Sequence, residues 1–590
     1  MVGGATDGSN YGGKQPISGA HIYLYAANTE GWGKPSISLL DSSVSGVSVD
    51  SLGSYVTSSS TGTFSFTGRY TCTPGQQVYV YAYSGNPGHP NGQYNPAIGM
   101  LAIFGTCPSS GTFAGVISSF QMNEVSTVAS VYALSGFMSA PNQVAAGPST
   151  NAMTGLANAF ATYNNLVDLT SGLAKANNDQ GNGFIPQSKI NAIANSLVSC
   201  ANSLQTSAAC TTLFSATRTS AGTPSTIADA ALAMAHNPAQ NVTQIFNIAG
   251  AAPAYLPTLS VPPADWTLSI TFYSDDMPGP YYPAVDSQGN IWVPGYASNN
   301  LTRFSPLGVI TLDTYTYGGL KQPFAVAIDA QDNAWAVNFI PGATTISHFT
   351  STGSPVGMGT ACASSCFFPA FDTAGNLWVS GSTATTVFDS TGNKATSFTT
   401  DAYTSGIAIA SSGAAWTLGH AGGMYKLTLP SATTRLTQSL TTSTGNDFTP
   451  VAIDANENIW FISGNNSVLG KADSNGAMLT SSGYTGGGLS SPAGLAIDGS
   501  GRVWVANRGN SSISEFGSDG TALSPSTGLG TDTYTVQDVE VGIHGPRGIV
   551  VDNAGNVWVT NFTYNSVTEL VGAATPTATP ILPSNHGKLP

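Results

Sequence analysis

Residues 492–507 read PAGLAIDGSGRVWVAN, and this stretch specifies the fold of the C-terminal half of the chain. An apolar run leads to Asp498, three turn residues and Arg502 follow, and Trp504 begins a second apolar run. Residues 546–561, PRGIVVDNAGNVWVTN, repeat the pattern with Asn in place of Arg. The unit is therefore an apolar strand, a tight turn that begins with Asp, and a strand that carries Trp.

The unit recurs seven times between about residues 266 and 572. Seven of the nine tryptophans fall in its frame, at spacings of 43, 43, 38, 44, 44 and 54 residues. They are Trp292, Trp335, Trp378, Trp416, Trp460, Trp504 and Trp558, preceded by Asp286, Asp329, Asp372, Asp454, Asp498 and Asp552, with Ala410 at the Asp position of the fourth unit. A period of 40–45 residues with alternating strands predicts a seven-bladed β-propeller.

Each unit has an expected role for its Asp and its Trp. The Asp accepts hydrogen bonds from the turn amides, and the Trp packs between neighbouring blades. The last unit ends soon after Leu570 and lacks a fourth strand, whereas residues 266–272, WTLSITF, precede the first unit without one of their own. We predict that this upstream segment completes the last blade, because an open ring would expose sheet edges.

The rest of the chain changes its pattern twice. Residues 1–116 alternate apolar and polar positions between Gly, Ser and Pro turns, which predicts a β-sandwich. Residues 117–250 show helical spacing, which predicts a small helical domain. Residues 251–265 read as a linker, 266–575 as the propeller and 576–590 as a flexible tail. The fold class is mainly β.

Charge and composition exclude several classes of function. Only 8% of the 590 residues are charged and the formal net charge is −14, which argues against a nucleic-acid partner. No run of 18 apolar residues occurs, so no membrane-spanning helix is expected.

Six cysteines lie in three local pairs: Cys72 with Cys107, Cys200 with Cys210, and Cys362 with Cys366. An even count with local pairing predicts disulfides and an oxidising compartment, and free buried thiols are the alternative. We expect an extracellular or cell-surface protein, with the periplasm as the alternative compartment. Met1 to Gly4 show neither a basic start nor an apolar stretch, so no signal peptide is visible in this sequence.

The strings at 492–507 and 546–561 resemble the NHL-type propellers, and among them the streptogramin-lyase-like (virginiamycin B lyase-like) group. Residues 16–20 and 59–66 resemble a prealbumin-like (carboxypeptidase regulatory-like) β-sandwich of secreted bacterial proteins. In streptogramin lyases the Trp strand leads to a Glu, and a His/Glu cluster with Mg²⁺ performs an elimination. The corresponding positions here are Gly295, Asn338, Gly381, Gly419, Gly464, Asn507 and Asn561, so the family's carboxylate is absent from every blade.

Candidates for chemistry remain outside that motif. His420 and His544 lie in loops of the ring, with Arg547 beside the latter, and histidine can act as a base or a metal ligand. Asp275 and Asp276 form an adjacent carboxylate pair that could bind Ca²⁺, with a solvated turn as the alternative. No cofactor is expected, with bound Ca²⁺ or Mg²⁺ as the alternative.

The residues that follow the Trp strands favour binding over catalysis. Aromatic rings beside amides, with few charges, suit sugar rings or peptide chains. The predicted ligand-binding residues are Tyr296, Asn338, Phe339, Asn507, Arg508, Asn561 and Phe562. The leading hypothesis is a secreted or surface binding protein for a carbohydrate or peptide. A lyase- or lactonase-like enzyme with a central divalent metal is the second hypothesis, and a self-assembling extracellular structural protein is the third.

Overall fold

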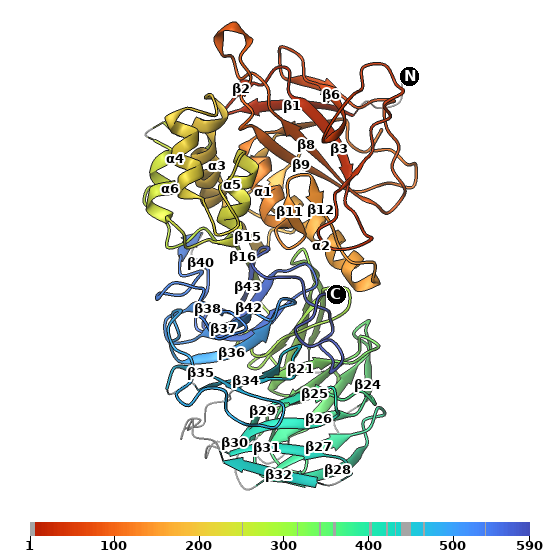
Figure 1. Cartoon of the computed structure of the whole chain (residues 1–590). Helices are drawn as coiled ribbons and strands as arrows, with labels where there is room; N and C mark the ends of the chain where they lie inside the picture. Colours follow the sequence, from red (N-terminus) through yellow and green to blue (C-terminus); the bar gives the residue numbers. More distant parts are fainter. Residues whose placement is uncertain are drawn as a thin grey trace. The chain divides into compact units, whose positions relative to one another are not determined.

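The structure is a computed structural model of the 590-residue chain. It describes residues 6–250, 252–315, 317–340, 344–357, 361–400, 404–419, 423–430, 432–437, 450–463, 466–536 and 539–590. The chain forms two compact units (Figure 1). Residues 1–269 with 571–573 make the N-terminal unit, and residues 270–570 with 574–590 make the C-terminal unit.

The N-terminal unit contains two main β-sheets. The smaller has the order β10 (Ser119–Met122), β1 (Asp7–Gly12), β2 (Gln15–Pro16), with β7 (Thr63–Ser65) also paired to β1. The larger has the order β5 (Ser48–Asp50), β6 (Gly53–Thr57), β3 (His21–Ala26), β8 (Gln77–Tyr83), β9 (Gly99–Thr106), with β4 (Ile37–Ser38) on β3. Phe66 and Phe120 from the smaller sheet's side pack on Phe104 of β9, with ring centroids 6.4 and 4.8 Å away.

Six helices are described in the same unit: α1 (Glu124–Leu134), α2 (Thr150–Leu166), α3 (Gln187–Ala201), α4 (Ala208–Ala216), α5 (Ile227–His236) and α6 (Val242–Ile248). Short strands β11 (Met138–Ala140), β12 (Gln143–Val144), β13 (Val167–Asp168), β14 (Leu173–Ala174) and β15 (Gly183–Phe184) connect them. Helices α1, α2 and α5 pack on β9. The Ser126 hydroxyl of α1 donates to the Leu101 carbonyl of β9 at 2.8 Å. The boundary expected at residue 116 therefore does not separate two compact units, since strands and helices share one core.

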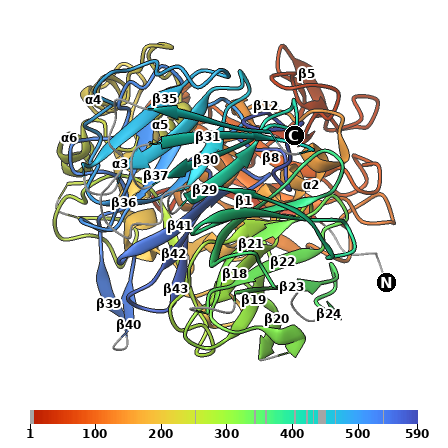
Figure 2. The same cartoon turned by 90° about the horizontal axis from the view of Figure 1, so that it is seen from below.

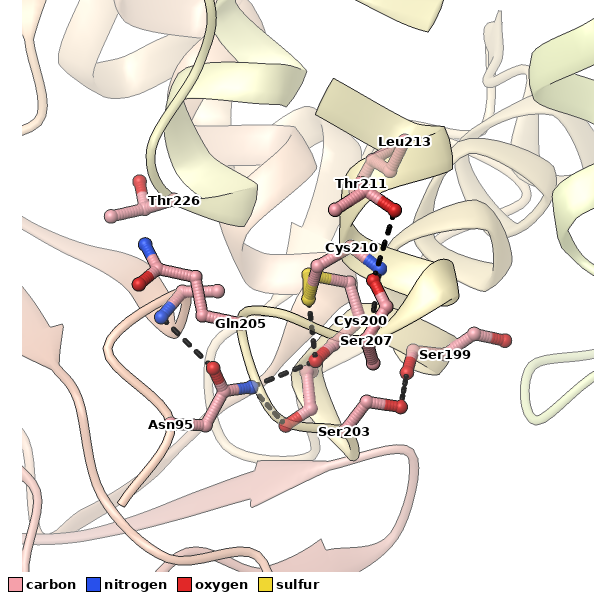
Figure 3. The surroundings of a disulfide bond; sticks show 12 residues. Asn95, Ser199, Cys200, Ser203, Gln205, Ser207, Cys210, Thr211, Leu213 and Thr226 are labelled. Carbon is pink, nitrogen blue, oxygen red and sulfur yellow. Dashed lines mark hydrogen bonds between the residues drawn. A yellow bond between two sulfur atoms is a disulfide. The ribbon is translucent and has the colours of Figure 1, made fainter. Parts of the chain in front are cut away.

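All six cysteines form the predicted disulfides, so the pairing expected from the local spacing is confirmed. The bonds join Cys72 to Cys107, Cys200 to Cys210, and Cys362 to Cys366. Figure 3 shows the second of them beside Asn95. The Asn95 amide donates to the carbonyls of Cys200 and Ala201 at 2.8 and 3.1 Å, which satisfies the end of α3 from the strand side.

The C-terminal unit is a propeller (Figure 2), and its described residues form seven blade sheets and a separate two-stranded hairpin. The first four blades have four strands each. The first consists of β17 (Ala284–Val285), β18 (Ile291–Gly295), β19 (Asn300–Phe304) and β20 (Ile310–Tyr315), and the second of β21 (Pro323–Ile328), β22 (Ala334–Asn338), β23 (Thr345–Phe349) and β24 (Pro355–Gly357). The third consists of β25 (Cys366–Phe371), β26 (Leu377–Gly381), β27 (Ala384–Phe388) and β28 (Lys394–Thr399), and the fourth of β29 (Thr404–Ile409), β30 (Ala415–Gly419), β31 (Gly423–Thr428) and β32 (Ala432–Thr437).

The fifth and sixth blades have three named strands each. They are β33 (Val451–Ile453), β34 (Ile459–Ser463), β35 (Val468–Ala472), and β36 (Pro492–Ile497), β37 (Val503–Asn507), β38 (Ser512–Phe516). The seventh blade has the order β16 (Ser269–Tyr273), β43 (Ser566–Leu570), β42 (Val557–Asn561), β41 (Pro546–Val551). A hairpin of β39 (Tyr534–Val536) and β40 (Val539–Val541) lies before β41 in the chain.

The upstream segment closes the ring, as predicted. Strand β16 pairs with β43, so the chain's first propeller strand completes its last blade. The hydroxyls of Thr271 and Thr568 are 3.1 Å apart, and the rings of Phe272 and Trp558 stack with centroids 5.6 Å apart. The blade thus joins the two ends of the repeat region and leaves no open edge between the first and last units.

One hydrogen-bonded group repeats from blade to blade. In the third blade, Asp372 Oδ1 accepts from the backbone N–H groups of Ala374 and Asn376, both at 2.9 Å. Its Oδ2 accepts from the Asn376 amide and from Trp378 Nε1, also at 2.9 Å. The corresponding indole bonds elsewhere span 2.8–3.2 Å, from Trp292, Trp335, Trp460, Trp504 and Trp558 to Asp286, Asp329, Asp454, Asp498 and Asp552. The Asp therefore fixes the turn and the Trp rotamer together.

The tryptophans pack between blades, as expected. Trp292 of the first blade lies in a core cluster with Val326, Ile328 and Phe349 of the second. Trp460 of the fifth blade packs with Leu495 of the sixth in the same way. Each of these blades therefore buries its indole against the sheet that follows it, which one blade alone cannot do.

In four blades the residue paired with Trp on the next strand out packs on the indole ring. Arg303, Lys426 and Lys471 place their cations 4.5–5.1 Å from the indole centroids of Trp292, Trp416 and Trp460. His348 stacks on Trp335 at 3.7 Å, and burial lowers the pKa of its imidazole. His348 therefore has the structural role that its strand position suggests.

The C-terminal segment is folded against the propeller, in contrast to the flexible tail expected at 576–590. The Thr577 N–H donates to the Asp552 carbonyl at 3.1 Å, and the Thr579 hydroxyl donates to the Asp286 carbonyl at 2.9 Å. A Cβ on Gly499 would overlap the Pro576 carbonyl oxygen, so the close approach of the two segments requires glycine there. No local pattern in residues 576–590 predicts this docking, because it depends on turns from several blades.

A buried carboxyl lies at the start of α1 in the N-terminal unit. Glu124 has no exposed surface; its Oε2 accepts from the Tyr255 hydroxyl at 2.5 Å and from the Gly13 N–H at 3.1 Å. Glu124 Oε1 and Asn202 Oδ1 are buried without partners, and both lie within 3.5 Å of the position that a Cβ on Gly12 would take. Burial raises the pKa of Glu124 to about 7.

The Asp–Trp bond predicts a large and specific loss of stability. Asp372→Ala leaves the Trp378 indole N–H and two turn amides without their acceptor, and we expect the propeller to lose about 2 to 4 kcal/mol. Asp389→Ala is the matched control, because Asp389 accepts from turn amides in the same blade but bonds no indole. Calorimetry should show the propeller transition lowered by several degrees in the first variant alone. Equal shifts in both variants would contradict the role assigned to the indole bond.

Glu124 predicts a pH dependence confined to the N-terminal unit. The pKa of Glu124 is higher in the folded protein than in the unfolded chain, so the folded state holds an extra proton at pH values between the two. The stability that this protonation contributes is present at low pH and is lost as the pH rises towards and past 7. Glu124→Gln keeps an acceptor for Tyr255 and adds a donor for Asn202, so it should stabilise the unit at pH 8 by on the order of 3 kcal/mol and hardly at all at pH 4.5. Glu30→Gln, an exposed acid, is the control. Melting curves at both pH values test this, and a Glu124→Gln variant less stable than wild type at pH 8 would refute it.

Candidate functional site

The candidate site is one end of the propeller. At this end the first strand of each blade, such as β21, begins, and the second strand, which carries the Trp, such as β22, ends. The register pairs Pro323 with Asn338, Pro492 with Asn507 and Pro546 with Asn561. The Asp turns lie at the opposite ends of the same strands, where the C-terminal segment docks. We call the end with the asparagines the rim.

The three rim asparagines point into their blades. Asn338 is fully buried, and its amide nitrogen donates to Thr345 Oγ1 at 3.1 Å and to Ser347 Oγ at 2.9 Å. Asn507 and Asn561 make the equivalent bonds to the third strands of their blades. Their Oδ1 atoms accept from the backbone N–H groups of Lys321, Ser490 and His544 at 3.0–3.2 Å. The amides thus anchor the entering loops and are engaged within the protein.

Aromatic side chains form the accessible part of the rim. Tyr281 lies at the centre of a group in which Tyr296 and Phe562 are each 5.3 Å away by ring centroid, and Phe324 is 4.9 Å away. Tyr281, Tyr296 and Phe562 are half-buried, whereas Phe324 is buried. Of the predicted residues, the structure therefore brings Tyr296 and Phe562 together. We call Tyr281, Tyr296, Phe562 and Arg547 the aromatic rim patch.

Arg547 completes this patch with a cation. Its guanidinium carbon lies 5.0 Å from the centroid of Phe562 and 5.6 Å from that of Tyr281. Its Nε is buried without a hydrogen-bond partner, and within the part of the chain that the structure describes no Asp or Glu forms an ion pair with it. The guanidinium is therefore positioned by aromatic rings and not by a carboxylate of the described residues.

The other predicted rim residues lie apart from this patch. Phe339 is half-buried and packs on Phe324 and Phe367, at 5.9 and 5.7 Å between centroids. Arg508 is exposed beyond the end of β37. Both remain candidates for contacts with a large ligand, but the aromatic rim patch does not depend on them.

The histidine candidates do not assemble into a catalytic group. His420 lies outside the described residues. His544 packs edge-on against Tyr564 with ring centroids 4.6 Å apart, and its Nε2 is buried without a partner. Burial lowers the pKa of its imidazole. Arg547 stacks on Phe562 and Tyr281 instead, so His544 and Arg547 belong to different groups of rings.

The carboxylate candidates for a metal lie in the segment that joins β16 of the seventh blade to β17 of the first. Asp275 and Asp276 are exposed, and the backbone carbonyl of Asp276 accepts from the Asn300 amide. Asn300 also donates to Asp313 at 2.8 Å, and burial together with the Asp276 charge raises the pKa of Asp313. Over the described ranges no group of three or more His, Cys, Asp or Glu side chains could hold a metal ion. Binding of Ca²⁺ or Mg²⁺ stays a prediction.

Tyr281 is the rim residue that the sequence pattern did not predict. The predicted residues follow the Trp strands, whereas Tyr281 and Arg547 come from the chain that enters inner strands. The Tyr281-Tyr282-Pro283 string before the first unit could have indicated this rim position, because the residues that enter one strand of a blade and those that leave its neighbour meet at the same end.

None of the described helices is long and apolar enough to cross a membrane.

Comparisons with known proteins find one family model and a set of similar solved structures. A model of the NHL repeat matches residues 489–516, which include the string from Pro492 to Asn507. No curated protein sequence is matched. Similar solved structures include a streptogramin B lyase, which is 14% identical over 51% of this chain and 96% of that chain, with a TM-score of 0.43. Virginiamycin B lyase from Staphylococcus aureus is 14% identical over 51% of this chain and 97% of that chain, with a TM-score of 0.42. Hydrazine synthase from Kuenenia stuttgartiensis is 15% identical over 51% of this chain and 97% of that chain, with a TM-score of 0.37.

Sequence identities of 14–15% carry no information about the function of this chain. The resemblance to NHL-type propellers that the repeat indicated is confirmed by the match at residues 489–516, and the strand pairing independently makes the C-terminal half a seven-bladed ring in its described residues. Residues 489–516 thus carry an NHL repeat, within a C-terminal unit whose described strands form a seven-bladed propeller.

Proposed function

We propose that the protein is a secreted or surface-attached binding protein whose aromatic rim patch recognises a carbohydrate. One observation carries this proposal: Arg547 lies over Tyr281 and Phe562 with no carboxylate ion pair among the described residues. Aromatic faces accept the apolar face of a sugar ring, and guanidinium N–H groups donate to its hydroxyl oxygens. The compartment is supported by the three disulfides.

Charge favours a neutral ligand over an acidic one. The chain carries a net charge of −14, so a polyanionic polymer would be repelled at long range. A single guanidinium framed by rings suits hydroxyl-rich molecules that are held by stacking and short hydrogen bonds. A peptide with aromatic or proline residues is the competing ligand, since such side chains also stack on rings.

A glycan array probed with the full chain tests the proposal. We expect a defined set of neutral glycans to bind, and Phe562→Ala and Arg547→Gln to weaken that binding by about tenfold or more, since each removes one wall of the patch. Lys394→Gln is the matched control, because it removes an exposed cation at the start of β28, in the same unit and away from the rim. Binding that Lys394→Gln weakens as much as Arg547→Gln would overturn the assignment of the patch. A blank array beside a positive peptide library would replace the carbohydrate with a peptide.

A further inference from the structure

A second site lies inside the propeller, along the axis that the inner strands surround. The inner strands enclose a cavity of about 240 Å³, lined by residues of all seven blades and by the C-terminal segment. Apolar atoms make up most of the wall, and His586 is its one acidic or basic side chain among the described lining residues. The cavity is therefore distinct in chemistry from the aromatic rim patch, and it does not depend on the function proposed for that patch.

The cavity exists because one position of the repeat is small. The inner-strand residue paired with Trp is alanine in six blades and valine in the seventh, and all seven line the cavity. These residues are Ala284, Ala327, Ala370, Ala408, Ala452, Ala496 and Val550. A leucine at these positions would fill the space, so the repeated small side chain keeps the axis open.

Each end of the cavity is narrowed by a different element. Pro580, Ile581, His586 and Gly587 of the C-terminal segment close the end near the Asp turns. A Cβ on Gly587 would lie 3.1 Å from Ile497 and 3.3 Å from the Ala455 nitrogen, so the segment approaches the inner strands closely there. At the other end Tyr282 and Phe368 also line the cavity, with ring centroids 4.5 Å apart.

His586 brings a polar group to this apolar wall. The side chain is 8% exposed, its Nδ1 is buried without a hydrogen-bond partner, and it lines the cavity. Burial lowers the pKa of the imidazole to about 4, and the Lys588 charge adds to this effect, so the ring is neutral at physiological pH. A neutral imidazole offers one donor and one acceptor, both of which a hydroxyl group can match.

The geometry points to a binding site for a small, neutral, apolar molecule that carries one hydroxyl group, with the ring against the alanine wall and the hydroxyl against His586. An apolar cavity of about 150 Å³ is enough to hold benzene, so a cavity of about 240 Å³ has room for one six-membered ring that carries a hydroxyl group. A one-ring alcohol fits the volume, gains from leaving water and satisfies the imidazole.

Titration of the full chain with phenol and with toluene, followed by ligand-observed NMR, tests this site. We expect both probes to bind the wild-type protein. His586→Phe keeps a ring in place but removes both nitrogens. It should therefore weaken the binding of phenol about tenfold and change the affinity for toluene less than about twofold. Ala496→Val adds two methyl groups to the wall and should weaken both probes, and Ala452→Leu should abolish both.

Two control variants show whether these effects are specific to the cavity. Ala374→Leu enlarges an exposed alanine of the same propeller and should leave both affinities unchanged. Phe562→Ala removes part of the aromatic rim patch and should also leave the affinities for phenol and toluene unchanged. A failure of the cavity proposal can therefore be distinguished from a failure of the rim-patch proposal. Calorimetry of each variant shows whether its propeller is folded. Absence of binding to the wild-type protein, or binding that a folded Ala496→Val or Ala452→Leu variant retains in full, would overturn the inference.

Discussion

The bond from the indole N–H of six of the seven motif Trp residues to the Asp six residues before each is the interaction on which the propeller depends. A buried carboxylate is costly unless its oxygens are satisfied, and here the indole, two turn amides and in most blades an Asn side chain satisfy them. The bond holds the Trp where the next blade covers it, so the local turn and the contact between sheets are set together. The fourth blade has Ala410 instead, and its turn is closed by backbone bonds such as that from the Ala410 N–H to the Ala414 carbonyl.

Closure of the ring extends this local order to the whole unit. Because β16 completes the seventh blade, every Trp cluster has a neighbouring sheet to pack against. The C-terminal segment then docks on the Asp turns, where carbonyls such as those of Asp286 and Asp552 accept its hydrogen bonds. The two ends of the propeller therefore differ: one is covered by the chain's own C-terminal segment, and the other presents aromatic rings and the guanidinium of Arg547.

The two proposed sites share a physical origin in the scarcity of charge. With 8% charged residues, the unit builds its surfaces from rings, amides and aliphatic groups. At the rim this leaves Arg547 among aromatic neighbours, and along the axis it leaves His586 among aliphatic ones. In both places a single polar group in apolar surroundings sets the orientation of a ligand, while the apolar wall supplies most of the free energy of binding.

The linear pattern was sufficient to predict the blade number, the closing strand, the disulfide pairs and the burial of the tryptophans, because each follows from a regular spacing or a local pairing. It also identified Tyr296 and Phe562 as rim residues. Tertiary contacts, in contrast, turn the amides of Asn338, Asn507 and Asn561 into their own blades, bring Tyr281 beside Arg547, and dock residues 576–590. Those outcomes depend on which groups meet in space, and a period along the chain carries no information about the direction of a side chain where seven strands converge.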